Sequence, residues 1–301
     1  MAAYATLAFL SLLWGSSFLL IKIAAGLFDP FGFALARVGV ASVALLIAGA
    51  LTGGVWPGRR LGLWLKLFAL SVVGQVAPFL LLGKAAQMTT SADMALMMGA
   101  SPIFVFLAGR FVRSGDRWTV AGAFGLALGF AGVGLALWSP TAPTVAAAHP
   151  AEGRALALLA TFCYAMSTLI SGDATREVGA VRAVAASMTI STAAMAVIAA
   201  AFGARPSIAT ILSAPTAPIL AIVTLGVFNT ALAYFVYFRL VVSEGPTFAS
   251  LNNYIVPLIG VMGGALALGE PVALAAWAGL ALVLAGVALT GRSLMRRALK
   301  S

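Results

Sequence analysis

Long apolar stretches follow one another along the chain, separated by short polar or charged breaks. A helix that crosses a membrane needs about 20 mostly apolar residues, and the stretches reach that length. The breaks carry helix-stop signals such as Asp29-Pro30, Trp56-Pro57-Gly58 and Gly269-Glu270-Pro271. The pattern predicts an all-α integral membrane protein with ten transmembrane helices, at residues 3–25, 31–52, 61–83, 92–112, 118–138, 155–172, 183–202, 216–238, 247–268 and 271–291.

The two halves of the chain resemble each other. Residues 126–135 read LALGFAGVGL and residues 280–289 read LALVLAGVAL, identical at seven of ten positions at an offset of 154. Because each half holds an odd number of helices, the second half must enter the membrane from the opposite side. We therefore expect two inverted five-helix repeats, a plan that recurs in membrane carriers. The boundaries are 1–139 for the first repeat, 140–153 for a proline-containing linker and 154–301 for the second repeat.

Composition agrees with lipid as the surrounding solvent. Of the 301 residues, 62% are hydrophobic and only 9% are charged, against roughly 25% charged residues in an ordinary soluble domain. That leaves too little polar surface for a water-soluble globule.

The net charge of +10 follows membrane topology rather than a nucleic-acid surface, because the basic residues lie mostly in the breaks between apolar stretches. If the N-terminus is cytoplasmic, that side receives 13 Lys and Arg residues and the other side four, leaving aside Arg37 inside the second span. The positive-inside rule then predicts that both termini are cytoplasmic. We expect a multi-pass protein of the bacterial inner membrane, surrounded by lipid and without a nucleic-acid partner.

Catalytic and metal-binding side chains are scarce. The chain has one cysteine, Cys163, and one histidine, His149. These residues, with a few acids in breaks or at helix edges, assemble neither a nucleophile with its base nor a metal cluster, and no Walker-type phosphate loop is present. We therefore expect no enzyme, no cofactor and no metal site. The oligomeric state stays open, and a monomer is compatible with the sequence.

Several motifs, in this order and spacing, resemble the drug/metabolite transporter superfamily. They are Leu13-Trp14-Gly15-Ser16-Ser17-Phe18, Ala36-Arg37, the stretch 225–257 and Gly269-Glu270-Pro271. The chain is most similar to EamA-type ten-helix exporters, and among them to YddG-like proteins. The resemblance implies a secondary transporter that exports amino acids or related small metabolites, and the YddG-like branch implies aromatic amino acids.

The first, fourth and sixth predicted helices carry candidate substrate-binding residues. Trp14 lies about eleven residues into its span, so two roles fit its indole: packing beside Gly15, or stacking on a substrate in a cavity. Ser17 and Tyr164 are candidates on the first and sixth helices. Met97 and Ser101 share one face of the fourth helix, which fits either a permissive apolar cavity or ordinary packing.

Polar and aromatic residues on three further helices complete the set. Their amides and hydroxyls could bind the ammonium and carboxylate of an amino acid, and interhelical hydrogen bonding is the alternative role. These candidates are Gln75 and Phe79 on the third helix, Asn229 and Tyr234 on the eighth, and Asn253 and Tyr254 on the ninth. The in-span prolines Pro78, Pro102 and Pro257 are hinge candidates, with static kinks as the alternative.

Charged residues near the spans have mostly structural interpretations. Arg37 lies about six residues into its helix and either extends toward the membrane surface or faces a cavity, whereas Lys22 is expected to extend outward. Asp116 and Glu270 precede the last helix of each half and are expected to cap it.

The expected mechanism is alternating access, in which the two repeats rock about a central cavity. No carboxylate lies deep within the predicted spans, so the sequence favours uniport or exchange over proton coupling. The alternatives are an exporter of other metabolites or drugs, and a channel-like facilitator.

Overall fold

The computed structural model describes residues 2–51, 54–101, 103–105, 107, 120–137, 149–202, 214–244, 246–249 and 252–298, and every regular element in these ranges is a helix. In chain order the elements are α1 (Ala2–Ala24), α2 (Pro30–Leu51), α3 (Leu61–Ser71), η1 (Val72–Val76), α4 (Ala77–Ala86), α5 (Ser91–Met98), α7 (Val120–Leu137), α8 (Pro150–Val178), α9 (Ala180–Ala201), α11 (Thr216–Gly226), η2 (Val227–Leu232), α12 (Ala233–Ser243), α13 (Pro246–Ala249), α14 (Asn252–Ala267) and α15 (Leu274–Ala298).

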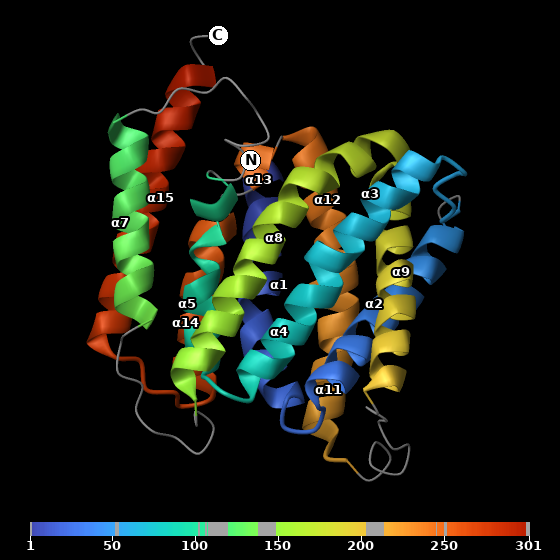
Figure 1. The fold of residues 1–301 in the computed structure, drawn as a ribbon, viewed down its shortest axis with the longest axis horizontal. Coiled ribbons are helices and arrows are strands. Elements are labelled where there is room, and N and C mark those ends of the chain that lie inside the picture. Colours follow the sequence, from blue (N-terminus) through green and yellow to red (C-terminus); the bar gives the residue numbers. More distant parts are fainter. Residues whose placement is uncertain are drawn as a thin grey trace.

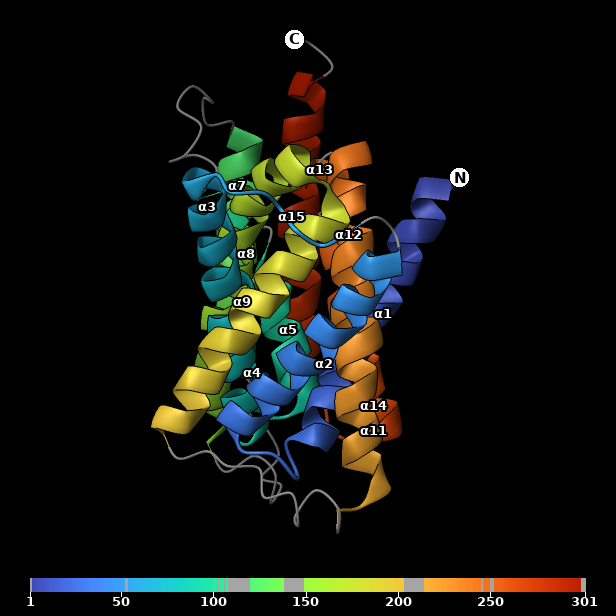
Figure 2. The ribbon, with the colours of Figure 1, turned by 90° about the vertical axis from the view of Figure 1, so that its right-hand side faces the viewer.

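Six helical segments of the described chain are long and apolar enough to cross a membrane. The apolar parts of α5, α7, α14 and α15 are shorter. Helix α1 begins and α15 ends at the same end of the molecule (Figures 1 and 2). The six segments are Ala2–Ala24, Pro30–Leu51, Leu61–Ala86, Pro150–Val178, Ala180–Ala201 and Thr216–Ser243.

Two helices, α1 and α8, lie at the centre of the packing. Helix α1 contacts α14, α11, α12 and α5, and α8 contacts α4, α5, α3 and α12. Helices α2 and α9 pack against each other, and α7 and α15 form a separate pair at one edge of the bundle (Figure 1). The core residues that hold this arrangement are large apolar side chains such as Leu10, Phe33, Met94 and Phe238, all nearly or fully buried.

Two of the long helices contain a π-helical turn. In the segment Leu61–Ala86 this turn is η1, and in Thr216–Ser243 it is η2. A π turn widens the helix and leaves backbone carbonyls open to other donors. The Gly74 carbonyl in η1 accordingly accepts a 2.7 Å hydrogen bond from the Tyr234 hydroxyl, which crosses from α12.

The predicted helix 155–172 is too short at both ends, because α8 runs from Pro150 to Val178. Its polar ends stay helical because their charges have partners: Arg154 pairs with Asp93, and Glu177 lies 3.4 Å from Lys66. Helix α8 then stops at Gly179, whose φ of 84° lies in the left-handed region that favours glycine. A single residue therefore joins α8 to α9.

Other predicted boundaries also differ: the helix predicted to end at 238 runs to Ser243, and the one predicted at 271–291 is Leu274–Ala298. Residues 150–153 of the predicted linker belong to α8, while its residues 140–148 lie outside the described part of the chain. The predicted helix 247–268 corresponds to the short α13 and to α14, and residues 250 and 251 between them lie outside the described part of the chain.

Candidate functional site

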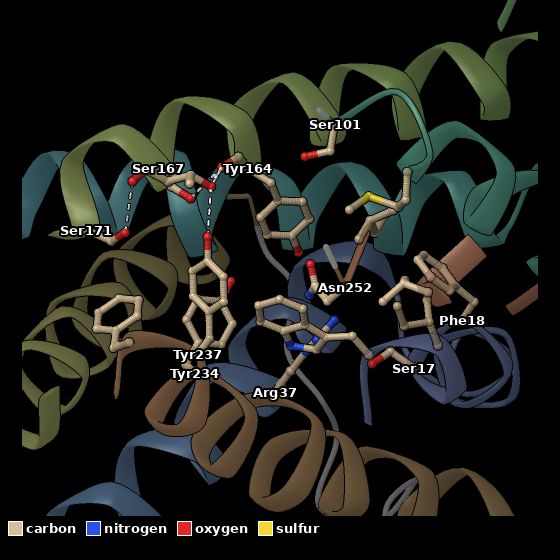
Figure 3. A pocket seen from close by; sticks show the side chains of 17 residues that line it. Ser17, Phe18, Arg37, Ser101, Tyr164, Ser167, Ser171, Tyr234, Tyr237 and Asn252 are labelled. Carbon is tan, nitrogen blue, oxygen red and sulfur yellow. Dashed lines mark hydrogen bonds between the residues drawn. The ribbon is translucent and has the colours of Figure 1, made fainter. Parts of the chain in front are cut away.

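A cavity lies inside the bundle between helices α1, α2, α4, α5, α8, α12 and α14 (Figure 3). It holds ≈ 760 Å³ of atom-free space, including the open space at its mouth. The lining residues are Trp14, Ser17, Phe18, Ile21, Arg37, Leu82, Met98, Ser101, Tyr164, Ser167, Thr168, Ser171, Tyr234, Tyr237, Phe238, Asn252 and Val256.

Aromatic rings from three helices form one wall of the cavity. The Trp14 ring on α1 lies 5.8 Å from the Tyr234 ring and 5.0 Å from the Tyr237 ring, both on α12. Tyr164 reaches in from α8 (Figure 3). Rings at such distances and inclined to one another attract through their quadrupoles, and a planar ligand can join the same arrangement.

A row of hydroxyls on α8 faces this wall. Ser167, Thr168 and Ser171 each donate to a carbonyl of their own helix, at 2.8, 3.0 and 3.1 Å. The Tyr237 hydroxyl donates to the Thr168 oxygen at 3.3 Å. Because the hydroxyl protons of Ser167 and Ser171 are already engaged, the capacity that remains to them is that of acceptors.

Arg37 on α2 supplies the positive charge of the cavity lining. The side chain is almost completely buried, at 3% exposed. Its Nε donates to the Thr230 hydroxyl at 2.9 Å, and its guanidinium carbon lies 4.0 Å from the centre of the Phe79 ring. The Nη1 atom has no hydrogen-bond partner among the described residues. Of the two positions that the sequence left open for Arg37, the structure has the cavity-facing one.

Asn252 opens α14 and is fully buried. Neither its amide nitrogen nor its amide oxygen has a partner within the described chain. In Figure 3 the Asn252 amide, the Arg37 guanidinium and the Tyr164 hydroxyl point toward the same part of the cavity. The cavity therefore holds a charged hydrogen-bond donor, the Arg37 guanidinium, beside the Asn252 amide, whose donor and acceptor atoms both lack partners among the described residues.

Five of the predicted substrate-binding residues line this cavity. They are Trp14, Ser17, Ser101, Tyr164 and Tyr234.

Four others are placed elsewhere, in contacts between helices. The Gln75 amide hydrogen-bonds with the Ser191 hydroxyl of α9 at 3.1 Å. The Asn229 amide donates to the Leu13 carbonyl and, at 3.1 Å, to the Ser16 hydroxyl, both on α1. Phe79 lies against the Arg37 guanidinium, and Met97 is packed in the core at 1% exposed.

Some of the remaining predicted residues, or their side chains, lie outside the described part of the chain. The side chains of Asn253 and Tyr254 and the hinge candidate Pro102 are not among the described residues. Pro78 lies in the first turn of α4, directly after the π turn η1, and Pro257 lies inside α14. No observation tests the hinge role of either proline, which stays a prediction.

Asn252 and Ser167 are polar cavity residues that the sequence did not single out for binding. The predicted face of the ninth helix was built on Asn253, and Asn252 lies one position away on the adjacent face. The signal for Asn252 was present, because an amide in an apolar span is costly unless it faces protein or a cavity. Which face meets the cavity follows from the packing of α14 against α1 and α5, which the sequence of the helix alone does not contain.

Polar links hold four helix ends together on one side of the cavity. Lys22, near the end of α1, donates to the carbonyls of Ala86 and Thr89 at 2.7 and 2.5 Å, so the expectation that it extends outward was wrong. Arg154 of α8 and Asp93 of α5 form an ion pair. Together these contacts tie α1, α8 and the start of α5 to the turn after α4.

Glu270 completes this group of links, and its predicted role needs correction. Its carboxylate accepts from the backbone nitrogens of Ser91 and Ala92 at 3.0 and 3.1 Å and from the Ser91 hydroxyl at 2.7 Å. It therefore caps α5, not α15, because the turn after α14 folds back onto the start of α5. Asp116, its predicted counterpart, lies outside the described residues.

Known proteins with similar sequences and folds fit this arrangement. The chain is 24% identical over 283 residues, 93% of its length and 95% of the relative's, to an uncharacterized transporter of Archaeoglobus fulgidus. A solved crystal structure covers 100% of the chain at a TM-score of 0.68 and 19% identity, which shows a shared fold. The EamA-like transporter family matches residues 1–138 and 152–292. The chain is thus a multi-pass membrane protein and belongs to the EamA-like transporter family.

Proposed function

We propose that this protein is a secondary transporter that exports amino acids, aromatic ones foremost, or related small metabolites across the inner membrane by alternating access. The observation that carries the proposal is the cavity, which lies between helices of both sequence halves and which aromatic rings, hydroxyls, an amide and a guanidinium line. An aromatic amino acid needs a surface for its ring, acceptors for its ammonium and donors for its carboxylate, and the lining offers all three.

The helix contacts support ten spans arranged as two inverted repeats. Helix α1 packs on α14, α11 and α12, and its counterpart α8 packs on α5, α3 and α4, which are the counterparts of those three helices. The pairs α2–α9, α7–α15 and α5–α14 each join an element with its own counterpart. The π turns η1 and η2 contain Gln75 and Asn229, which are separated by the offset of 154 seen in the sequence repeat.

Close contacts between α7 and α15 follow the same symmetry. A Cβ atom at Gly132 would lie 2.6 Å from the Gly279 carbonyl oxygen. A Cβ atom at Gly286 would collide with the Gly125 carbonyl. Gly132 corresponds to Gly286 and Gly125 to Gly279 at the offset of 154, so the two contacts exchange under the proposed twofold relation. Small residues that let backbones approach are a common basis of helix pairing in membranes.

The chemistry of the lining supports transport without an embedded proton carrier. The lining residues include no Asp, Glu or His among the described part of the chain. Proton-coupled carriers usually hold such a group on the substrate path. We therefore propose uniport, or exchange of one substrate for another, driven by the substrate gradient.

The contacts of Lys22, Asp93, Arg154 and Glu270 support an assignment of the conformational state, that is, of the side of the membrane to which the cavity opens. With both termini cytoplasmic, as the charge distribution predicts, these residues lie on the far side of the membrane. The links would then close the cavity on that side and leave the cytoplasmic side as the route of entry, as an exporter requires before it loads.

Counterflow into proteoliposomes tests the proposed function. Purified protein would be reconstituted with or without unlabelled phenylalanine inside, and uptake of labelled phenylalanine, tryptophan, threonine and methionine would be followed. We expect saturable uptake that internal substrate accelerates, with the aromatic amino acids preferred. Flux that neither saturates nor accelerates would indicate a channel-like facilitator, and no flux of any amino acid would reject this substrate class in favour of other metabolites or drugs.

A further inference from the structure

We infer that Arg37 and Asn252 form a subsite for a carboxylate, so that the transported molecule carries one carboxylate group next to an aromatic or apolar part. This inference rests on the proposed function, because it names the chemical group that the cavity recognises. Neutral amides and alcohols, and positively charged amines, of otherwise equal shape would then be poor ligands.

The first argument for the carboxylate subsite is the charge balance of the cavity. The Arg37 guanidinium lies among the core helices at 3% exposure, where it contacts the neutral Thr230 hydroxyl and the Phe79 ring. No carboxylate lies within 4.0 Å of it in the described structure. Burying an ion away from water is costly unless an opposite charge compensates it. An anionic ligand would supply that compensation.

The acidic residues of the described chain have partners other than Arg37 or lie away from the cavity. Asp93 pairs with Arg154, Asp173 with Arg176, and Glu177 with Lys66 and Arg60. Glu270 caps α5, and Asp29 accepts from the first turn of α2 through the nitrogens of Phe31 and Gly32. None of these carboxylates lines the cavity.

The second argument for the carboxylate subsite is the set of hydrogen-bonding groups in the cavity that lack partners. Arg37 Nη1 and both polar atoms of the Asn252 amide are buried and without partners within the described residues. Buried polar groups are almost always hydrogen-bonded, so a group of them facing one cavity indicates a ligand that completes their bonds. A carboxylate has two acceptor oxygens and could accept from both the guanidinium and the Asn252 amide nitrogen.

The aromatic wall gives the rest of the ligand its character. Trp14 and Tyr164 line the same cavity as Arg37, and Figure 3 shows the Tyr164 hydroxyl directed toward Asn252 and Arg37. A ligand whose carboxylate binds Arg37 could therefore place a ring among these residues without leaving the cavity.

Ligand binding to the purified full-length protein tests the subsite without relying on transport. The probes would be 3-phenylpropionate, 3-phenylpropanamide and phenethylamine, with 4-methylpentanoate as an aliphatic acid, and binding would be measured by thermal shift and calorimetry. We expect 3-phenylpropionate to bind at least about tenfold more tightly than its amide and phenethylamine not to bind. Equal binding of acid and amide, or no binding of either acid, would overturn the subsite.

Variants then locate the subsite. Arg37→Gln should abolish the preference for the acid over the amide, whereas Arg37→Lys should keep part of it. Arg176→Gln, the same charge change at an exposed position on α8, should bind like the unsubstituted protein. Should Arg37→Gln fail to fold, Asn252→Asp keeps the shape and gives Arg37 an internal carboxylate, so acid binding should fall and phenethylamine binding should rise. An unchanged preference in Asn252→Asp would overturn the subsite.

The outcomes for the subsite and for the proposed function are separable. Acid-selective, Arg37-dependent binding without amino-acid flux would keep the subsite and reject amino acids as the cargo. Accelerated amino-acid exchange by a protein that binds acids and amides equally would keep the function and reject the subsite.

Discussion

The Arg154 guanidinium of α8 and the Asp93 carboxylate of α5 form an ion pair, with Nε and Oδ1 3.0 Å apart and side chains 4% and 8% exposed. The Thr89 hydroxyl donates to the second carboxylate oxygen at 2.5 Å. A buried pair of this kind is held mainly by the cost of separating it, because removing one partner leaves the other charge buried without compensation.

Asp93→Asn is therefore expected to lower the free energy of unfolding by about 3–5 kcal/mol. Replacing both partners, with Asp93→Leu and Arg154→Met, removes both charges and should cost much less. Unfolding in a fixed detergent, followed by circular dichroism, would measure the two variants. If the double variant were as unstable as Asp93→Asn, packing rather than charge would account for the contact.

Glu270 stabilises the start of α5 across a long sequence separation. Glu270→Gln keeps the side-chain shape but weakens the bonds to the Ser91 and Ala92 nitrogens, and we expect a loss of about 1–2 kcal/mol in stability. Glu152→Gln is the matched control, because the Glu152 side chain is 68% exposed. Thermal unfolding of both variants under the same conditions would compare them, and equal midpoints would count against the cap.

Backbone contact between α7 and α15 makes the glycines there sensitive to a single methyl group. Gly132→Ala should force the helices apart and destabilise the protein by about 1–3 kcal/mol, because its Cβ would lie 2.6 Å from the Gly279 oxygen and 2.8 Å from the Val283 nitrogen. Gly263→Ala on α14, where a Cβ meets nothing within 4 Å, should be neutral or slightly stabilising. Thermal unfolding distinguishes them, and similar midpoints would argue against close packing of this pair.

The apolar pattern located the helices of the described chain but not the polar contacts that cross between them. The start of α1 and the start of α2 differ from prediction by one residue, because apolar runs and Asp29-Pro30 mark them directly. The ends of α8 were missed because polar residues there remain helical through partners on other elements, such as Asp93 for Arg154. No single-segment pattern contains that information.

The sequence likewise identified only part of the cavity lining. Trp14, Ser17, Ser101, Tyr164 and Tyr234 were singled out by residue type and depth, and the structure brings them into one cavity. Gln75 and Asn229 have the same qualities in sequence yet bond to neighbouring helices. Which way a residue faces depends on the π turns η1 and η2 and on the packing of α14 against α1 and α5, and an apolar run of ordinary composition carries no signal for these.

Trp14 should contribute to substrate selection more than to stability. Trp14→Leu removes the indole but keeps an apolar side chain, so we expect the KM for an aromatic substrate to rise about tenfold, which corresponds to about 1.4 kcal/mol. The KM for an aliphatic substrate should change little. Asn229→Leu, which breaks the bond to Ser16, serves as the comparison and should lower stability without altering the preference. Equal KM changes for both substrates in Trp14→Leu would assign the indole to packing.

Cysteine labelling can test whether the links at one end of the cavity close it. In a Cys163→Ala background, Ser17→Cys would be exposed to an impermeant maleimide in inside-out and right-side-out vesicles. We expect labelling mainly from the cytoplasmic side, because the contacts of Lys22, Arg154 and Glu270 hold the opposite helix ends together. Adding Asp93→Asn removes one link and should raise labelling from the opposite side. Ser42→Cys, buried at 4% exposed between α2 and α9, should stay unlabelled in both orientations. Unchanged labelling of Ser17→Cys after Asp93→Asn would mean that the ion pair stabilises the fold without controlling access.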